Sequence, residues 1–182
     1  MLGGGGLVAI AYGLSKMGGA KAPVLGRRVA LVGDSLAVGL GPPLQKLALA
    51  KAVAFQYQGV VGTTPLQWSE NASACGPCGS WLGTFKPDTI LVSLGTNDIG
   101  YYPQPPAGPY QALVRRWSTI GRVVWIQPPI MPSDRLAGVR SVIASLGVPT
   151  IPAQTGLSFG TDGIHPTNYV PWAQSIAAQV FT

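Results

Sequence analysis

From Arg28 onward the chain alternates short apolar runs with stretches that favour helix, and this alternation constrains the fold more than any other feature. The apolar runs, which predict buried strands, cover residues 28–35, 53–62, 89–98, 122–129 and 148–153. Helix is predicted for 42–52, which two prolines would begin, and for 110–121, 133–147 and 168–181, with a helical turn at 80–85. Continuous apolar strands separated by helices form a parallel sheet that is covered on both faces. We therefore expect an α/β fold, a three-layer α/β/α sandwich with a five-stranded parallel sheet.

A glycine-rich apolar segment, residues 1–27, precedes a single predicted domain at 28–182. The lysines of this segment follow its apolar stretch, whereas a secretory signal carries positive charge before its apolar core. The stretch is also too short and too rich in glycine for a transmembrane helix, which needs about 20 apolar residues. The sequence leaves three interpretations open: an atypical leader, a membrane-associating segment, or a flexible tail ahead of the domain.

The chain is basic, with 12 Lys and Arg against six acids and a formal net charge of +6. No zinc-finger spacing, RNP-like motif or basic aromatic stripe accompanies these bases, so we expect no nucleic-acid partner. A diffuse basic surface fits an anionic polymer or a cell-envelope partner. Charged residues make up only 10% of the chain, well below the roughly 25% of an average soluble domain. This scarcity favours an extracytoplasmic protein, secreted or associated with an envelope or a virion.

The two cysteines, Cys75 and Cys78, form the motif CGPC, whose spacing resembles a thioredoxin-type redox pair. Such a pair normally starts a helix directly after a core strand, whereas the flanks SENASA and GSWLG favour a loop. We therefore favour a small disulfide that staples this loop, or a pair of free thiols, over a redox centre. A disulfide would imply an oxidising compartment.

Four polar clusters marked by glycine fall where a parallel sheet would bring them together. They are GDS at 33–35, the glycine at Gly62, GTND at 95–98 and DGIH at 162–165. Ligands of parallel sheets bind outside the carboxyl ends of the strands, and the first three clusters follow strands there. Each cluster alone is typical of a turn or a helix cap. Their order and placement together favour a catalytic site.

These clusters resemble the four blocks of the SGNH hydrolases, the GDSL-type esterases, which are named for Ser, Gly, Asn and His. The chain offers Ser35, Gly62, Asn97 and His165 in that order, and the resemblance spans 28–182. GDSL is literally present, GTND matches the third block, DGIHP matches the D-x-x-H fourth block, and the glycine block is the least distinctive. The resemblance implies the flavodoxin-like SGNH hydrolase fold and cleavage of carboxylic esters without a cofactor. It also implies substrates that range from O-acetylated polysaccharides to lipids and thioesters.

The chemistry of these side chains supports the same roles. A serine hydroxyl is a poor nucleophile until a base takes its proton, and His165 is the only imidazole in the chain that can do so for Ser35. Asp162, three positions before His165, is close enough to orient the ring. The tetrahedral oxyanion would be held by the N–H groups of Ser35 and Gly62 and by the side-chain amide of Asn97.

Two further aspartates in these clusters, Asp34 and Asp98, are expected to be structural and to accept hydrogen bonds from nearby loop N–H groups. Tyr101 and Tyr102, in a proline-rich loop, either contact substrate, on a sugar ring or an acyl group, or simply pack in a surface loop. The cysteine loop is flanked by Trp68 and Trp81, which raise the same alternatives. No cluster has metal-ligand spacing, so the sequence predicts no metal site.

The expected function is a serine esterase that removes short acyl groups, acetyl in particular, from a glycan such as an O-acylated polysaccharide or peptidoglycan. Three alternatives stay open. They are a lipolytic or thioesterase-type enzyme of the same kind, a non-catalytic glycan-binding or structural module, and a thiol–disulfide protein.

Overall fold

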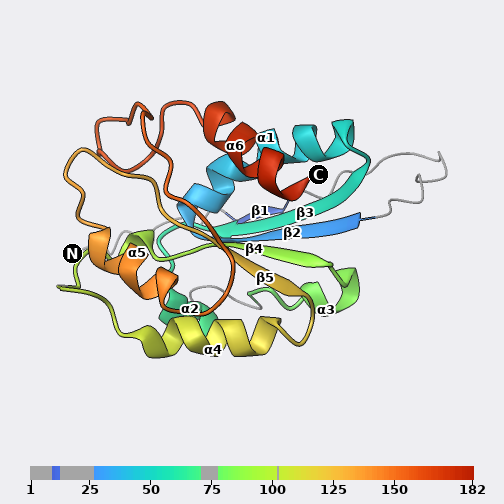
Figure 1. Cartoon of the computed structure of the whole chain (residues 1–182), viewed down its shortest axis with the longest axis horizontal. Helices are drawn as coiled ribbons and strands as arrows, with labels where there is room; N and C mark the ends of the chain where they lie inside the picture. The colour runs from blue at the N-terminus through green and yellow to red at the C-terminus, as the bar shows by residue number, and fades with distance from the viewer. Residues whose placement is uncertain (1–9, 13–26, 71–77, 102) are drawn as a thin grey trace, which may run out of the picture.

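The computed structural model describes residues 10–12, 27–70, 78–101 and 103–182, which form an α/β/α sandwich around a six-stranded sheet (Figure 1). The strands are β1 (Ile10–Tyr12), β2 (Arg27–Gly33), β3 (Val53–Val60), β4 (Thr89–Ser93), β5 (Arg122–Ile126) and β6 (Thr150–Ile151). Their spatial order is β1-β3-β2-β4-β5-β6, and β2 to β6 run parallel. The predicted five-stranded parallel sheet is therefore confirmed.

Strand β1 was not predicted from the sequence; it is an antiparallel edge strand next to β3, with Ala11 beside Gly59. Its three residues lie inside the glycine-rich segment, where so short an apolar run gives no strand periodicity. The remainder of segment 1–27 lies almost wholly outside the described residues, so the leader and tail interpretations stay predictions. Within the described part of the chain, no helix is both long enough and apolar enough to cross a membrane.

Strand β2 divides the core into two layers because its side chains alternate between the faces of the sheet. Ala30 and Val32 pack into one buried cluster, together with side chains of the helices below the sheet in Figure 1. Val29 and Leu31 pack into the other, against the two helices above it. All four are fully buried, so both faces of the sheet are covered, as the unbroken apolar runs predict.

Six helices and one 3-10 turn cover the two faces of the sheet in the described part of the chain. On one face lie α1 (Ser35–Ala50) and α6 (Val170–Val180). On the other lie α2 (Pro65–Ser69), α3 (Leu82–Phe85), α4 (Ala107–Trp117) and α5 (Ala137–Ala144). The 3-10 turn η1 (Thr96–Asp98) follows β4.

Helix α1 begins seven residues before the predicted start at Pro42, directly at the end of β2. The two prolines lie inside the helix, although each lacks the N–H that an interior position donates. A fully buried stripe at four-residue spacing, formed by Leu36, Leu40, Leu44 and Ala48, explains why the helix continues through them. The early start places Ser35 on the first turn of a long, well-packed helix.

Candidate active site

Ser35 is the first residue of α1 and stands at the carboxyl end of β2. The preceding Gly33 is required by close packing, because a Cβ there would lie 2.0 Å from the carbonyl oxygen of Ser93 in β4. The same carbonyl accepts a hydrogen bond from the N–H of Asp34, at 3.0 Å. The strand-to-helix turn that presents Ser35 is therefore held directly by the neighbouring strand.

Asp34, the residue before Ser35, is the N-cap of α1 and is fully buried. One carboxylate oxygen accepts the N–H of Leu36 at 3.0 Å, and the other accepts the N–H of Thr96 at 3.3 Å. Burial raises the pKa of this carboxyl to about 7, although both backbone hydrogen bonds act to lower it. One side chain thus ties the loop of Ser35 to the loop of Asn97, and the structural role expected for Asp34 is confirmed.

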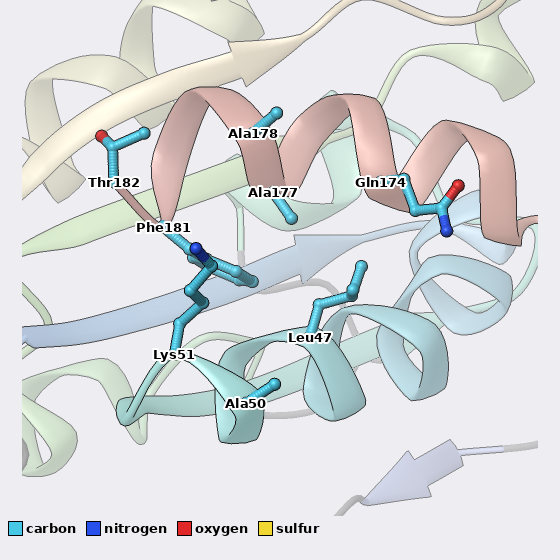
Figure 2. Close-up of a pocket in the computed structure, with 8 residues that line it drawn as sticks. All are labelled: Leu47, Ala50, Lys51, Gln174, Ala177, Ala178, Phe181 and Thr182. Carbon is cyan, nitrogen blue, oxygen red and sulfur yellow. The ribbon is translucent and has the colours of Figure 1, made fainter.

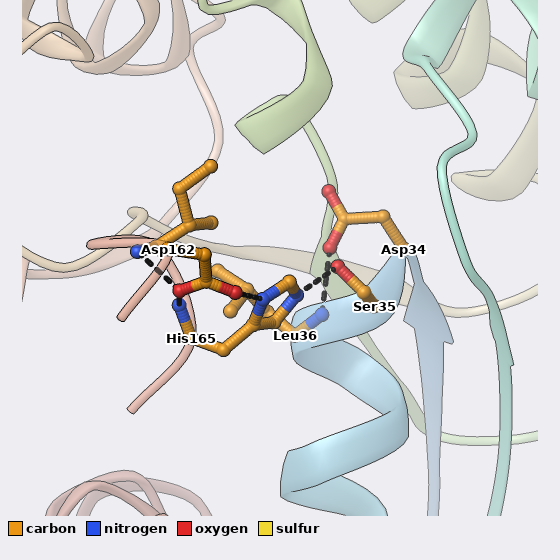
Figure 3. Close-up of polar contacts among 6 residues, drawn as sticks. Asp34, Ser35, Leu36, Asp162 and His165 are labelled. Carbon is orange, nitrogen blue, oxygen red and sulfur yellow. Dashed lines mark hydrogen bonds and ion pairs between the residues drawn. The ribbon is translucent and has the colours of Figure 1, made fainter. Parts of the chain in front are cut away.

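His165 lies between Ser35 and Asp162, as Figure 3 shows. Its Nε2 is 2.8 Å from the Ser35 Oγ, and its Nδ1 is 2.6 Å from Oδ2 of Asp162. The ring and the carboxylate are about half-exposed, at 41% and 48% of their side-chain surface. The structure therefore brings together, in one hydrogen-bonded row, three residues that lie up to 130 positions apart in sequence.

The loop that carries Asp162 and His165 is braced by its own backbone. The second carboxylate oxygen of Asp162 accepts the N–H groups of Ile164 and His165, at 2.9 and 3.0 Å. The bond to the His165 ring, followed by these two backbone bonds, holds the pKa of Asp162 well below its usual range. Gly163 takes a positive φ of 67°, and the N–H of Gly160 donates to the His165 carbonyl at 2.8 Å. The ring orientation follows from this tight turn.

Asn97 lies in the η1 turn after β4 and faces the loop that carries Gly62. Its Nδ2 donates to the carbonyl of Thr63 at 2.8 Å. The Thr63 hydroxyl donates to the Val60 carbonyl at 2.7 Å and accepts from the indole N–H of Trp68 at 2.8 Å. Gly62 is exposed, with a φ of 76°. The Asn97 amide keeps a second N–H besides the one given to Thr63, which is available to a ligand.

Asp98 departs from the sequence expectation, because its partner is a side chain on α4 and not a loop N–H. The hydroxyl of Tyr110 donates to the Asp98 carboxylate at 2.7 Å. Burial is the main cause that raises the pKa of both groups. The same hydroxyl would lie 2.9 Å from a Cβ at Gly95, whose φ is 117°. This buried pair anchors the Asn97 turn to α4.

Thr63, Thr96 and Tyr110 are site-supporting residues that sequence reasoning missed. Thr63 directly follows Gly62 and Thr96 lies within the GTND cluster, so their places in those clusters were the available signals. Tyr110 lies outside every cluster, and the pairing of Thr96 with Asp34 and of Tyr110 with Asp98 depends on the fold.

The remaining sequence candidates have mixed outcomes. Tyr101 follows η1 at the same edge of the sheet and is 52% exposed. Its neighbour Tyr102 lies outside the described residues, as does Cys75, so the disulfide with the buried Cys78 stays a prediction. Trp68 is fully buried, which excludes direct contact with substrate. Among the residues that the structure describes, no group of three or more His, Cys, Asp or Glu side chains is placed to hold a metal ion.

The parallel sheet with helices on both faces is an α/β/α fold that this chain shares with solved structures of the lipolytic G-D-S-L family. No family model and no curated protein matches the sequence. Solved structures do match. A protein assigned to the lipolytic G-D-S-L family from Desulfitobacterium hafniense is 12% identical, with a TM-score of 0.62 over 84% of this chain and 98% of its own.

Two other solved structures are similar to a comparable degree. A member of the lipolytic G-D-S-L family from Veillonella parvula is 19% identical, with a TM-score of 0.58 over 85% of this chain and 97% of its own. The catalytic domain of Streptococcus pneumoniae peptidoglycan O-acetyltransferase A, solved with a methylsulfonyl adduct, is 17% identical, with a TM-score of 0.56 over 84% of this chain and 91% of its own. At these identities the likeness establishes the fold.

Proposed function

We propose that the chain is a serine esterase of the SGNH hydrolase family that cleaves carboxylic esters through an acyl-enzyme on Ser35. The observation that carries the proposal is the row of hydrogen bonds from Ser35 Oγ through both ring nitrogens of His165 to Asp162. A hydroxyl, a base and an orienting acid in this order are what acyl transfer needs.

In the first half-reaction, Ser35 Oγ attacks the ester carbonyl carbon while His165 Nε2 takes the hydroxyl proton. Asp162 accepts from Nδ1 and stabilises the imidazolium that forms. The alcohol then leaves with the proton that His165 returns to it, and the acyl group stays on Ser35. Water repeats the sequence in the second half-reaction, with His165 as general base, and releases the carboxylic acid.

The oxyanion that forms in both halves requires hydrogen-bond donors outside this row. We assign the N–H groups of Ser35 and Gly62 and the second N–H of the Asn97 amide. Support comes from the position of Ser35 at a helix N-terminus, where N–H groups lack helical partners and the dipole favours negative charge. The bond from Asn97 to Thr63 holds that amide beside the Gly62 loop.

For the substrate, we propose short acyl groups, acetyl in particular, on a glycan of the cell envelope. One supporting observation is that a similar fold serves a peptidoglycan O-acetyltransferase catalytic domain. The low content of charged residues supports an extracytoplasmic location, where such glycans lie.

A lipolytic activity is the second candidate, because one observation favours it. Six large hydrophobic side chains are exposed in the described part of the chain, and five of them lie on loops or helix starts after the carboxyl ends of the strands. These five are Val61, Leu66, Tyr101, Ile130 and Val170. They share an edge of the sheet with Ser35, where a long acyl chain would find apolar surface.

Hydrolysis of p-nitrophenyl acetate tests the mechanism. We expect turnover by the wild type and loss of at least about 10³-fold in Ser35→Ala. Ser141→Ala, which removes an exposed hydroxyl from α5, is the matched control and should keep full activity. A Cys75→Ser/Cys78→Ser variant tests the thiol–disulfide alternative and should also stay active. Activity that persists in Ser35→Ala would refute the mechanism. An inactive wild type would favour the alternative of a non-catalytic glycan-binding or structural module.

The two substrate candidates are separated by a series of p-nitrophenyl esters from acetate to octanoate, together with acetylated xylan and peptidoglycan. A kcat/KM at least tenfold higher for acetate than for octanoate, with acetate released from one of the glycans, supports the deacetylase. The reverse order of the two esters, with no release from either glycan, supports the lipolytic enzyme.

A further inference from the structure

Basic residues lie at or just before the amino ends of four neighbouring parallel strands. Ser35 lies at the opposite, carboxyl ends of these strands. Arg27 and Arg28 begin β2, and Arg122 begins β5. Lys51 and Lys86 come two and three residues before β3 and β4. We call these five residues the basic row. Since β3, β2, β4 and β5 are neighbours in that order, the row crosses the sheet from side to side.

The row carries a charge that acids do not balance. Asp88 is the one acidic side chain at the described strand starts, and its carboxylate accepts the backbone N–H of Arg28 at 2.8 Å. The guanidinium of Arg28 stacks over the ring of Phe85, 4.7 Å from its centre. Arg28 is therefore held in place while its charge stays exposed, together with the exposed Lys51, Lys86 and Arg122.

Helix dipoles explain part of the basic row but not all of it. Lys51 and Lys86 are the C-cap residues of α1 and α3, where a cation stabilises the negative end of the helix. Arg27 begins β2, but its guanidinium also donates to the backbone oxygen of Thr182, just past the C-terminal end of α6. Arg122 begins β5 and caps no helix, so its charge needs another explanation.

A cavity of about 130 Å³ lies between Arg27 and Arg122. Thr89, Thr150 and Gln179 also line it, and no acidic residue is among the described residues that do so. One water needs roughly 10–15 Å³ of such space, so a phosphate group fits. Arg27 also donates to the backbone oxygen of Thr182 at the end of α6, which orients its guanidinium at this edge.

A second cavity, of about 350 Å³, adjoins the same end of α6 and extends the basic row toward α1. Figure 2 shows Lys51 reaching from α1 toward Phe181, with Thr182 close by. Leu47 and Ala177 give this cavity an apolar floor. A polymer that lies along the row would therefore also meet apolar surface beside Lys51.

We propose that the basic row binds a linear phosphate polymer that carries no bases, with one phosphate seated between Arg27 and Arg122. Adjacent strands lie about 4.8 Å apart, so the row presents at least one basic residue at each successive strand. This spacing suits a polymer whose anionic groups are close together. Single-stranded nucleic acids also need aromatic side chains on which bases stack. Phe85 at this edge is buried beneath Arg28, and Tyr101, the exposed aromatic residue of the described part, lies at the opposite edge. The site is separate from Ser35 and independent of the proposed esterase activity.

Fluorescence polarisation with labelled inorganic polyphosphate tests this site on the full chain. We expect Arg27→Gln/Arg122→Gln to weaken binding at least tenfold. The control Arg115→Gln/Arg135→Gln, which removes two exposed arginines elsewhere, should weaken it less than threefold. The slope of log K against log salt should fall by about one for each lost contact in the first variant. Thermal unfolding and the single variant Arg122→Gln, which keeps the Arg27 contact, show whether loss of binding reflects loss of fold.

Equal loss in the two double variants would overturn the proposal, because net charge alone would then explain binding. Tighter binding of a DNA oligonucleotide than of polyphosphate with the same number of charges would overturn the assignment to a base-free polymer. Ser35→Ala should bind polyphosphate like the wild type, so failure of the esterase proposal and failure of this one are separate results.

Discussion

Two aspartates contact the machinery around Ser35, and their surroundings move their pKa values in opposite directions. Asp162 is half-exposed and accepts three hydrogen bonds, which hold its pKa well below the usual range. Asp34 is fully buried, and desolvation outweighs its two backbone bonds, so its pKa rises to about 7. The first carboxylate therefore stays charged beside His165 at any working pH. The second changes charge within the physiological range.

The raised pKa of Asp34 predicts a pH-dependent stability. Between about pH 4 and pH 7 the folded protein holds a proton on Asp34 that the unfolded chain has released, so the free energy of unfolding should fall as pH rises. One such proton contributes about 1.4 kcal/mol per pH unit. Above pH 7 this contribution should level off. Urea unfolding at pH 5, 6, 7 and 8 measures the trend.

The variant Asp34→Asn isolates this effect, because an amide keeps the shape and an acceptor oxygen but does not titrate. Asp98 also has a raised pKa, and since it is present in both proteins its contribution cancels in the difference. We expect the stability of Asp34→Asn relative to the wild type to increase from pH 5 to pH 8. A difference that stays constant over this range would show that Asp34 is charged throughout.

Among the secondary-structure elements, the turn between β4 and η1 does most to place Asn97. Gly95 makes this turn with a φ of 117°, and a Cβ there would lie 2.8 Å from Val139 Cγ1 and 2.9 Å from the Tyr110 hydroxyl. We expect Gly95→Ala to lower the free energy of unfolding by about 1–3 kcal/mol, from backbone strain and overpacking. The displaced turn should also lower kcat at least tenfold, because Asn97 would lose its alignment.

Gly108→Ala is the matched control for this substitution. Gly108 lies in the first turn of α4, and nothing stands within 4 Å of the position that its Cβ would take. Alanine there should leave kcat unchanged and raise the free energy of unfolding by up to about 1 kcal/mol. Chemical denaturation and steady-state kinetics on both variants measure the contrast. Equal effects in the two would mean that the β4–η1 turn tolerates a side chain.

The sequence predicted the elements and residues whose signals are local or lie at strand ends. Ser35 was predicted to lie at the carboxyl end of a strand, and His165 was predicted to contact it because it is the only imidazole in the chain and because the motifs resemble those of SGNH hydrolases. The structure places His165 Nε2 2.8 Å from Ser35 Oγ. The contact of Asp98 with Tyr110 was not predicted, because it depends on how α4 packs over the turn. The predicted start of α1 was wrong because Pro42 and Pro43 were taken to begin the helix, whereas the helix begins at Ser35, after its N-cap Asp34.

At the scale of the whole molecule, the parallel sheet separates two kinds of surface. Its carboxyl edge carries Ser35, His165 and the five exposed hydrophobic side chains, while its amino edge carries the basic row. This separation follows from topology, since parallel strands gather all their starts at one edge and all their ends at the other. An anionic polymer held at the amino edge would leave the edge with Ser35 open to a substrate.

The same topology predicts where the molecule opens first. Strand β2 is hydrogen-bonded on both sides, to β3 and β4, and its central residues are fully buried, whereas β6 is a two-residue edge strand paired only with β5. Exchange-protected amides mark the elements with the highest local stability. Hydrogen exchange followed by mass spectrometry should therefore be slowest in β2 and β4, and much faster in β6 and in the partly exposed loop 158–167 that carries His165. Ser35 would then lie just after the most stable strand of the fold, and His165 would lie on one of the least stable segments. Protection of 158–167 equal to that of β2 would contradict this division and would mean that His165 is held as rigidly as Ser35.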